Sequence, residues 1–561
     1  MTEPVPTDAK RETAGILSST AVMASGTVVS RMSGFVRSAL LIAALGGGLH
    51  ADLFNIANTV PNMLYILLAG GIFNAVLVPQ LVRGMKHDAD GGIAYTNRIM
   101  TLAILFLGVV TILLVVAAPW VMSLFLDPDY NTAKLAAQQD SIIAFARFCL
   151  PQVFFYGMFV LVGQILNSRG RFGPMMWAPI ANNLIAVGVL VLYLVVYGPT
   201  GGPDGDSAYT FGQEALLGLG STLGIVVQLL ILLPYMSAAG YHYRPRFDFR
   251  DTGLGHTLRL GVWTVLFVVV NQIAYTVVVR LASGGTADAP PGADGTGYTV
   301  YSLTFLIVMV PHSVVTVSLA TAILPRLSAH AADTDFPALA RTLGVAMRSA
   351  LAVVIPFALL LPVIARDLAH VIWGWGAGKD DYELFAPTLG LFGFGLVFFT
   401  LHYLTLRGFY SLERTRTVFW IQCVVAAVNI AAAVVLVQVT DAEDTAPALV
   451  LAYTAAYAAG ALLSYLWLRH ALGGLGTSRL LRFLVRVVLA AAGSTAVALC
   501  VALLLDRIGA DPSIGVAAVR ALVVTVVDVV VFVILARLLR LGEVTDALDM
   551  VTRRLPSARR R

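Results

Sequence analysis

Two arginines lie inside an apolar stretch near the start of the chain. Arg31 and Arg37 fall within residues 17–46, a run long enough to cross a membrane. An arginine in hydrocarbon is costly unless it is solvated or paired. Two permanent cations that face a cavity suit an anionic ligand, and the guanidinium fork suits phosphate oxygens in particular. The alternative is a structural ion pair, or snorkelling of the side chains with a bend of the helix at Gly34.

Polar side chains also recur at helical spacing in later apolar stretches. The second stretch, residues 51–82, has an amide-lined face formed by Asn55, Asn58, Thr59 and Asn62. Further along, His312 lies one helical turn before Thr316, and Asn271 lies inside another apolar run. Interhelical hydrogen bonds in a packed bundle would explain these residues. We favour a hydrated central cavity, because the polar stripes fall on equivalent helices of the internal repeat described below.

Asp52 stands at the start of the second apolar stretch, where an N-cap is the default interpretation and a counter-ion to one of the arginines is the functional one. The three cysteines lie inside apolar runs, and the His, Cys, Asp and Glu residues have no metal-ligand spacing. No clustered carboxylate site is visible near a membrane face. We therefore expect no metal, no cofactor and no catalytic residue, and a protein that is not an enzyme.

The composition indicates a membrane protein. Of the 561 residues, 58% are hydrophobic and 12% charged, whereas soluble domains carry about a quarter charged residues. Apolar runs bounded by Gly, Pro and charged residues predict fourteen transmembrane helices. They lie at residues 17–46, 51–82, 98–126, 142–167, 174–198, 215–238, 256–283, 298–325, 343–364, 384–411, 417–439, 446–469, 481–505 and 515–538.

Basic residues are unevenly shared among the connections. Every second connection is rich in Lys and Arg, from Lys10 and Arg11 to the tail between Arg537 and Arg561, and the intervening connections are acidic or glycine-rich. Because short cytoplasmic loops collect Lys and Arg, both termini are predicted to be cytoplasmic. The net charge of +5 thus reflects topology, and we expect no nucleic-acid partner.

Two pairs of short segments predict an internal repeat. The segment ending in Pro79-Gln-Leu resembles the one ending in Pro325-Arg-Leu, 246 positions later, and Gly163 with its following arginines resembles Gly408, 245 positions later. Six helices separate the copies, so the two lobes should have parallel orientations. The predicted fold class is an all-α multi-pass membrane protein with 14 transmembrane helices in two parallel-related six-helix lobes plus two C-terminal helices. The predicted segments are a cytoplasmic N-terminal segment at 1–13, an N-lobe at 14–240, a C-lobe at 241–470, spans 13 and 14 at 471–540, and a basic cytoplasmic tail at 541–561.

Short motifs follow one another in a fixed order along the chain. They include Ser30-Arg31-Met32-Ser33-Gly34-Phe35-Val36-Arg37, Ala51-Asp52-Leu53-Phe54, Val60-Pro61-Asn62 and Leu324-Pro325-Arg326-Leu327-Ser328. Together they resemble the MurJ (MviN) family of the MOP exporter superfamily, over about Ser18 to Arg540. The resemblance implies a flippase that moves lipid II, the undecaprenyl-diphosphate-linked peptidoglycan precursor, to the outer leaflet by alternating access. It also implies a cavity lined by spans 1, 2, 7 and 8 and a groove for the lipid tail at spans 13 and 14.

The sequence departs from the family pattern at several places, two of which would hold arginines. Met63 and Leu64 follow Asn62 where the family has paired arginines, and Phe305 stands near the place of a further arginine. The predicted cavity is therefore more sparsely cationic than the family pattern implies.

We expect a lipid II flippase in the bacterial plasma (inner) membrane whose partners are lipid II, membrane lipids and cell-wall synthesis proteins. The residues expected to contact the substrate are Arg31, Arg37, Asp52, Asn62, Asn271 and His312, and Gly34 is expected to act as a hinge. Two alternatives stay open. One is an exporter of drugs or of other lipid-linked oligosaccharides from the same superfamily, although a drug exporter would want acidic cavity residues. The other is a non-transporting membrane scaffold for cell-wall synthesis.

Overall fold

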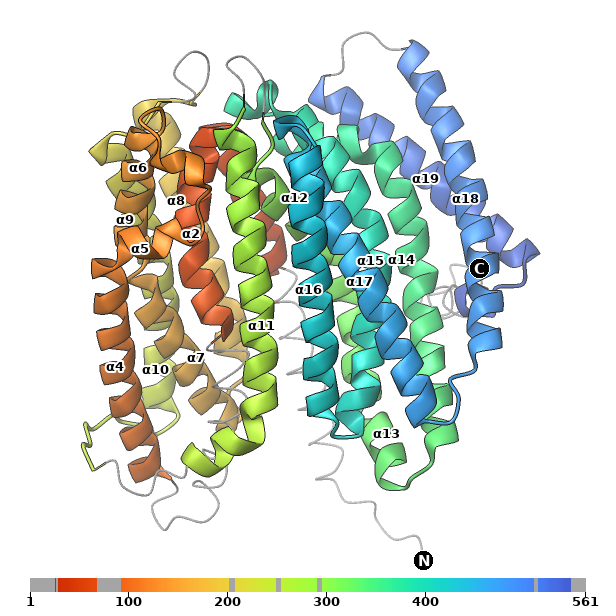
Figure 1. Ribbon diagram of the computed structural model, residues 1–561, viewed down its shortest axis with the longest axis horizontal. Coiled ribbons are helices and arrows are strands. Elements are labelled where there is room, and N and C mark those ends of the chain that lie inside the picture. The colour runs from red at the N-terminus through yellow and green to blue at the C-terminus, as the bar shows by residue number, and fades with distance from the viewer. Residues whose placement is uncertain are drawn as a thin grey trace, which may run out of the picture. The chain divides into compact units, whose positions relative to one another are not determined.

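The computed structural model describes residue 26 and residues 29–67, 92–200, 207–248, 254–289, 295–508 and 513–545 (Figure 1). Within these ranges all regular structure is helical, and no β-strand occurs. The chain forms two compact units, residues 1–272 and 273–561, here called unit 1 and unit 2. Their boundary falls inside one long helix, α11 (Leu254–Ala287).

Unit 1 is built from helices that are interrupted near prolines. Before α11, its described elements are helical residues 29–45, α2 (Leu49–Ile66), α4 (Ile93–Val116), α5 (Ala118–Ser123), η2 (Pro128–Asn131), α6 (Ala136–Cys149), α7 (Gln152–Ser168), α8 (Gly173–Tyr197), α9 (Phe211–Leu230) and α10 (Leu232–Ala238). Proline lacks an N–H donor and its ring clashes with the carbonyl four residues earlier. The breaks between α4 and α5, α6 and α7, and α9 and α10 accordingly lie just before Pro119, Pro151 and Pro234.

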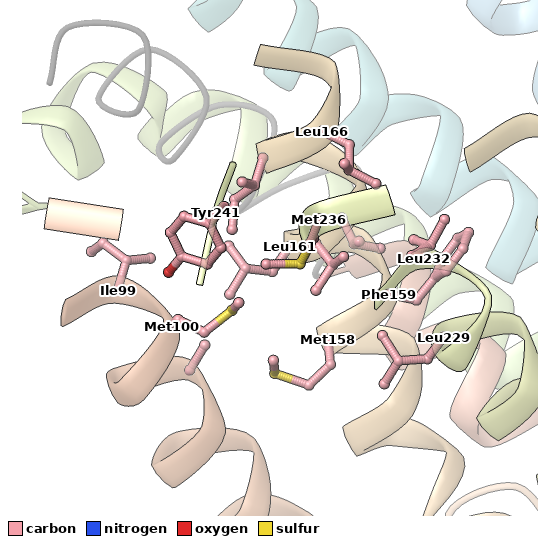
Figure 2. Packing of buried hydrophobic residues seen from close by; sticks show 14 of the residues in the cluster. Ile99, Met100, Met158, Phe159, Leu161, Leu166, Leu229, Leu232, Met236 and Tyr241 are labelled. Atoms are coloured by element: carbon pink, nitrogen blue, oxygen red, sulfur yellow. The ribbon is translucent and has the colours of Figure 1, made fainter. Parts of the chain in front are cut away.

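The hydrophobic core of unit 1 forms where α4, α7 and α10 meet (Figure 2). Ile99 and Met100 of α4, Leu161 of α7 and Met236 of α10 belong to one buried cluster with Tyr241, whose side chain is 1% exposed. Tyr241 lies shortly after the end of α10 at Ala238, so this cluster also fixes the connection that leaves α10. Helices in a bilayer gain little from exclusion of water, and close packing of this kind is what holds them together.

Unit 2 contains longer helices. Its described elements after α11 are α12 (Tyr298–Pro311), η4 (His312–Thr316), α13 (Val317–Ala332), α14 (Phe336–Trp373), η5 (Gly376–Lys379), α15 (Tyr382–Ser411), α16 (Thr415–Val439), η6 (Ala442–Asp444), α17 (Thr445–Ala471), α18 (Thr477–Ile508) and α19 (Ile514–Leu538). Glycines let α14 and α15 approach closely: a Cβ atom at Gly393 would lie 2.7 Å from the carbonyl oxygen of Ala358, and one at Gly390 would lie 3.1 Å from the Cα atom of Pro362. Small residues serve this purpose in membrane helix pairs.

Twelve helices among the described residues are long and apolar enough to cross a membrane. They begin with Ile93–Val116, end with Ile514–Leu538, and follow the order of the third to fourteenth predicted spans. The prediction of an all-helical multi-pass membrane protein is therefore confirmed. The first two predicted spans extend beyond the described residues, and so do the repeat segment ending at Leu81, the N-terminal segment 1–13 and most of the tail.

Candidate functional site

Arg31, Gly34 and Arg37 lie on one helix, formed by residues 29–45, which continues unbroken through Gly34. The Arg31 side chain is exposed and that of Arg37 is partly buried. Neither arginine forms an ion pair with any residue in the part of the chain that the structure describes. The structural ion pair considered from the sequence is thus not formed among these residues.

Arg37 lies within electrostatic range of two side chains from other helices. Tyr156 of α7 and Cys149 of α6 are close enough to interact with its guanidinium electrostatically. The Tyr156 ring packs against Tyr65 of α2, with ring centroids 4.8 Å apart. Tyr156 cannot be singled out from the sequence, because an aromatic residue in an apolar run gives no signal of its own.

Asn183 of α8 holds the arginine-bearing helix. Its side-chain Nδ2 donates to the carbonyl oxygen of Ser30 at 3.0 Å and to the Ser33 hydroxyl at 2.9 Å. Next to this contact, a Cβ atom at Gly34 would have its nearest neighbour, Asn183 Nδ2, at 3.9 Å. Packing therefore leaves room for a side chain at Gly34, so close packing does not require a glycine at this position. The role of Gly34 as a hinge stays a prediction.

Asp52 lies within the first turns of α2, and its side chain is fully buried. The N-cap of α2 is Gly48, and the Asp52 backbone N–H donates to the Gly48 carbonyl at 3.2 Å. The N-cap interpretation of Asp52 is therefore wrong. The N-cap lies four residues earlier than this interpretation placed it, because Gly48 adopts an extended conformation there. A carboxylate this close to the helix N-terminus is still favoured by the helix dipole.

One part of the amide face of α2 contacts another helix, and another part is exposed. Gln152 at the start of α7 donates through Nε2 to Asn58 Oδ1 at 3.0 Å, so Asn58 is an interhelical hydrogen-bond partner. Asn62 one turn later is exposed. Gln272 of α11 donates through Nε2 to the Met63 carbonyl at 2.6 Å, which joins the stretch that carries the exposed Asn271 to α2. Gln152 and Gln272 were missed from the sequence, although each is an amide within an apolar run.

His312 is buried within unit 2. Its ring centroid lies 4.6 Å from that of Phe399 and 4.9 Å from that of Tyr403, and its Nδ1 lies 3.3 Å from the Thr400 hydroxyl, all on α15. Thr316 is also buried, and its hydroxyl has no hydrogen-bond partner among the described residues. A buried hydroxyl without a partner is uncommon and marks this segment as a candidate for movement or ligand contact.

Asn62 and His312 occupy matching places in their helices. Val60-Pro61-Asn62 and Val310-Pro311-His312 share a valine–proline step, and each proline lies inside a helix. π-helical geometry follows each proline: it is found at Leu67, the last described residue of that stretch, and over His312–Thr316 directly after Pro311. Such turns are frequent at functional sites. This correspondence links the candidate site residues Asn62 and His312 to one local helix geometry.

Residues 241–248 form a basic segment of unit 1 that packs against α4. Tyr241 donates through its hydroxyl to Asn97 Oδ1 at 2.7 Å, and the Arg244 backbone N–H donates to the same oxygen at 3.0 Å. Arg98 donates to Asp248 Oδ2 through Nε at 2.9 Å and Nη2 at 2.6 Å. These hydrogen bonds from Arg98 lower the pKa of the Asp248 carboxyl, and burial raises the pKa of Tyr241. The segment 241–248 is thus tied along the first turns of α4.

Comparison with known proteins decides the family. A family model described as lipid II flippase MurJ matches residues 41–509. The chain belongs to the MurJ family. The predicted resemblance is confirmed, and membership of the MurJ family identifies the chain as a membrane transporter and not an enzyme.

Individual MurJ relatives are distant in sequence. The "Probable lipid II flippase MurJ" of Vibrio cholerae is 28% identical over 72% of this chain and 74% of its own length. That of Thermotoga maritima is 26% identical over 77% of this chain and 82% of its own length. A solved structure of lipid II flippase MurJ in an inward closed conformation has a TM-score of 0.68 at 16% identity, covering 92% of this chain and 99% of that one. An inward-facing multidrug resistance MATE transporter of the MOP superfamily has a TM-score of 0.60 at 14% identity, over 82% of this chain and 99% of that one.

Proposed function

We propose that this chain moves lipid II from the inner to the outer leaflet of the bacterial plasma membrane by alternating access. The observation that carries the proposal is the match of the MurJ family model to residues 41–509. Arg31 and Arg37, which have no ion-pair partner among the described residues, support it from the chain's own chemistry. A diphosphate is the anion that paired guanidinium groups bind well.

In this proposal each polar residue has a separate role. Arg31 and Arg37 hold the diphosphate, and Asp52 pairs with an arginine in one conformation of the cycle. Asn62 and Asn271, both exposed, contact polar parts of the headgroup, and His312 contacts it when the segment around Thr316 rearranges. Gly34 permits the first span to bend. These assignments rest on side-chain chemistry and exposure in each unit.

The topology belongs to the same proposal. Fourteen spans, made of two parallel-related lobes at 14–240 and 241–470 and two further spans within 471–540, place both termini in the cytoplasm. The alternation of basic connections supports this arrangement. Cell-wall synthesis proteins are proposed partners, since lipid II is their substrate.

The test replaces both arginines with alanine in cells that depend on this chain for lipid II export. The double variant R31A/R37A should abolish exposure of lipid II on the outer face, read by headgroup modification from outside, while the amount of protein in the membrane stays normal. R326A is the matched control, because Arg326 is an exposed arginine of α13 without an assigned role. Full complementation by the double variant would refute the proposed roles of both residues.

A second assay separates transport from a scaffold role. The purified chain in proteoliposomes should move lipid II between leaflets, and R31A/R37A should not. A scaffold would show no movement in either case while still supporting cell-wall synthesis in cells.

A further inference from the structure

Six arginines gather at one end of unit 2, where α14 and α18 begin and α19 ends. They line two adjoining cavities of about 310 and 230 Å³, which share Arg348 and Arg479. The set, here called the arginine pocket, consists of Arg341, Arg348, Arg479, Arg482, Arg486 and Arg540. None of these residues has a role in the transport proposed above.

Among the described residues, few negative charges compensate the positive charge of the arginine pocket. Within the described part of the chain, Glu543 is the one carboxylate among the lining residues of the pocket, and it already accepts a hydrogen bond from Arg348 Nε at 2.5 Å. Arg482 donates to the Ser478 carbonyl of its own helix at 3.2 Å. The other pocket arginines form no ion pair with the described residues, and Arg479, Arg482 and Arg486 are exposed. Guanidinium groups brought this close repel one another unless an anion lies between them.

The position of Arg479 also favours an anion. It lies in the first turn of α18, which begins at Thr477. The dipole of a helix disfavours a cation and favours an anion at its N-terminus. The arginine therefore lowers the stability of the helix end where it stands, and a bound anion would reverse that effect.

Arg540 is held in a strained backbone conformation at the edge of the pocket. Its φ is +55°, in the left-handed region that favours glycine. The Leu541 N–H donates to the Ala536 carbonyl at 2.9 Å, and the Leu541 and Val544 side chains are buried, so the turn after α19 is fixed. A glycine would suit this turn better, and the arginine places a guanidinium beside the cavity.

An exposed apolar stripe runs beside the arginines on α18. Arg479, Arg482 and Arg486 share one face at positions i, i+3 and i+7. Leu481 and Val485, at 59% and 53% exposure, lie one turn apart on a neighbouring face. A free inorganic anion would contact only the arginine face of α18. A phospholipid presents phosphate and hydrocarbon side by side and could contact both faces.

We propose that the arginine pocket binds the phosphodiester headgroup of an anionic phospholipid, with its acyl chains along the apolar stripe of α18. Arginine recognises phosphate oxygens with two parallel N–H donors, and basic pockets between membrane helices accept lipid headgroups. Glu543 holds Arg348 in place while the other guanidinium groups contact the phosphate. In the topology proposed above the bound lipid belongs to the cytoplasmic leaflet.

The test uses the full chain purified in a neutral detergent. Dioleoyl phosphatidylglycerol, dioleoyl phosphatidylcholine and inorganic phosphate are titrated separately, and binding is read from thermophoresis and from the thermal unfolding midpoint. Phosphatidylglycerol should bind saturably and raise the midpoint, and the other two should not. The variant R479A/R482A/R486A should lower the affinity for phosphatidylglycerol by at least about tenfold, the ratio that one lost charge-assisted contact explains. R326A should bind as the unchanged chain does.

R540G separates a ligand role from a structural one. It removes one guanidinium and relieves the positive φ, so the unfolding midpoint without lipid should stay or rise while the affinity for phosphatidylglycerol falls. Equal effects of phosphatidylglycerol and inorganic phosphate would overturn the lipid assignment, and unchanged affinity in both variants would overturn the site. Because the readout is binding by purified protein, its failure is distinct from a failure of lipid II transport.

Discussion

In unit 1, Arg98 donates two hydrogen bonds to Asp248, and Arg169 donates to the Ala239 carbonyl at 3.1 Å. In unit 2, Arg348 is the one member of the arginine pocket with a carboxylate partner among the described residues. Both sets lie in or next to connections that the sequence predicts to be cytoplasmic. Arginine-rich connections therefore have different structures in the two units. In unit 1 the arginines hold a loop by hydrogen bonds, and in unit 2 most of the pocket guanidinium groups have no carboxylate partner among the described residues.

The membrane-spanning parts of the units differ in a related way. After Pro61 in unit 1, Asn62 is exposed, whereas after Pro311 in unit 2, His312 is buried against aromatic rings of α15. Matching places in two helices thus carry a side chain available to a ligand and a side chain engaged in packing. The substitutions described below would break or sharpen these two comparisons.

The largest effect on stability is expected at His312, which follows Pro311, in contrast to Asn62, which follows Pro61. H312A removes two ring contacts and the interaction with Thr400, and should lower the free energy of unfolding by about 3 kcal/mol. N62A should leave it within about 0.5 kcal/mol, because the side chain is exposed, and yet reduce lipid II export. Chemical unfolding in mixed micelles measures the first quantity, and the export assay measures the second. A destabilised N62A beside an unaffected H312A would reverse the comparison.

An intermediate effect is expected for the fastened loop of unit 1. N97A deprives the buried Tyr241 hydroxyl and the Arg244 N–H of their shared acceptor, and should cost about 2 kcal/mol in the same unfolding measurement. I112A on the same helix is the control, since Ile112 is 65% exposed and should contribute little. If both variants were equally stable, the hydrogen bonds to Asn97 would not be what holds the segment.

The smallest effect is expected from the exposed Arg98–Asp248 pair, through its pH dependence. The folded pKa of Asp248 is lowered, chiefly by the hydrogen bond from Arg98, so its contribution to stability is present above the ordinary Asp value of about 3.9 and is lost as the pH falls through the lowered value. D248N should therefore have a slightly lower unfolding midpoint than the unchanged chain at neutral pH and the same midpoint in strong acid.

A double-mutant cycle with R98A isolates the Arg98–Asp248 interaction. The coupling should shrink as salt is added, because both side chains are partly accessible to solvent. A coupling that persists in strong acid would show that the pair does not act through the Asp248 charge.

Local patterns in the sequence predicted much of the fold. The third to fourteenth predicted spans have helical counterparts, because a run of about twenty apolar residues is a local property that the bilayer imposes on each helix separately. Helix ends were less certain. Asp52 was interpreted as an N-cap, and the helix in fact begins at Leu49, because the conformation of Gly48 depends on its neighbours.

The candidate site was predicted in its residue types and not in its contacts. Arg31 and Arg37 could be singled out because a charge in an apolar run is conspicuous. The partners Gln152, Tyr156 and Gln272 could not, since their relevance depends on which helices meet. An amide or a hydroxyl becomes a contact only when another helix brings a donor or acceptor within reach.

By itself, the sequence determined that the chain is a multi-pass membrane protein, and its ordered motifs indicated the MurJ family. Hydrophobicity and motif order are written along the chain and need no folding to be visible. Tertiary structure alone decided which polar residues are available. Asn58 is bonded while Asn62 is exposed, and Arg348, Arg479 and Arg540 meet although they are far apart in sequence. The physical reason is that burial and pairing are properties of packed surfaces, which form only where separate helices come together.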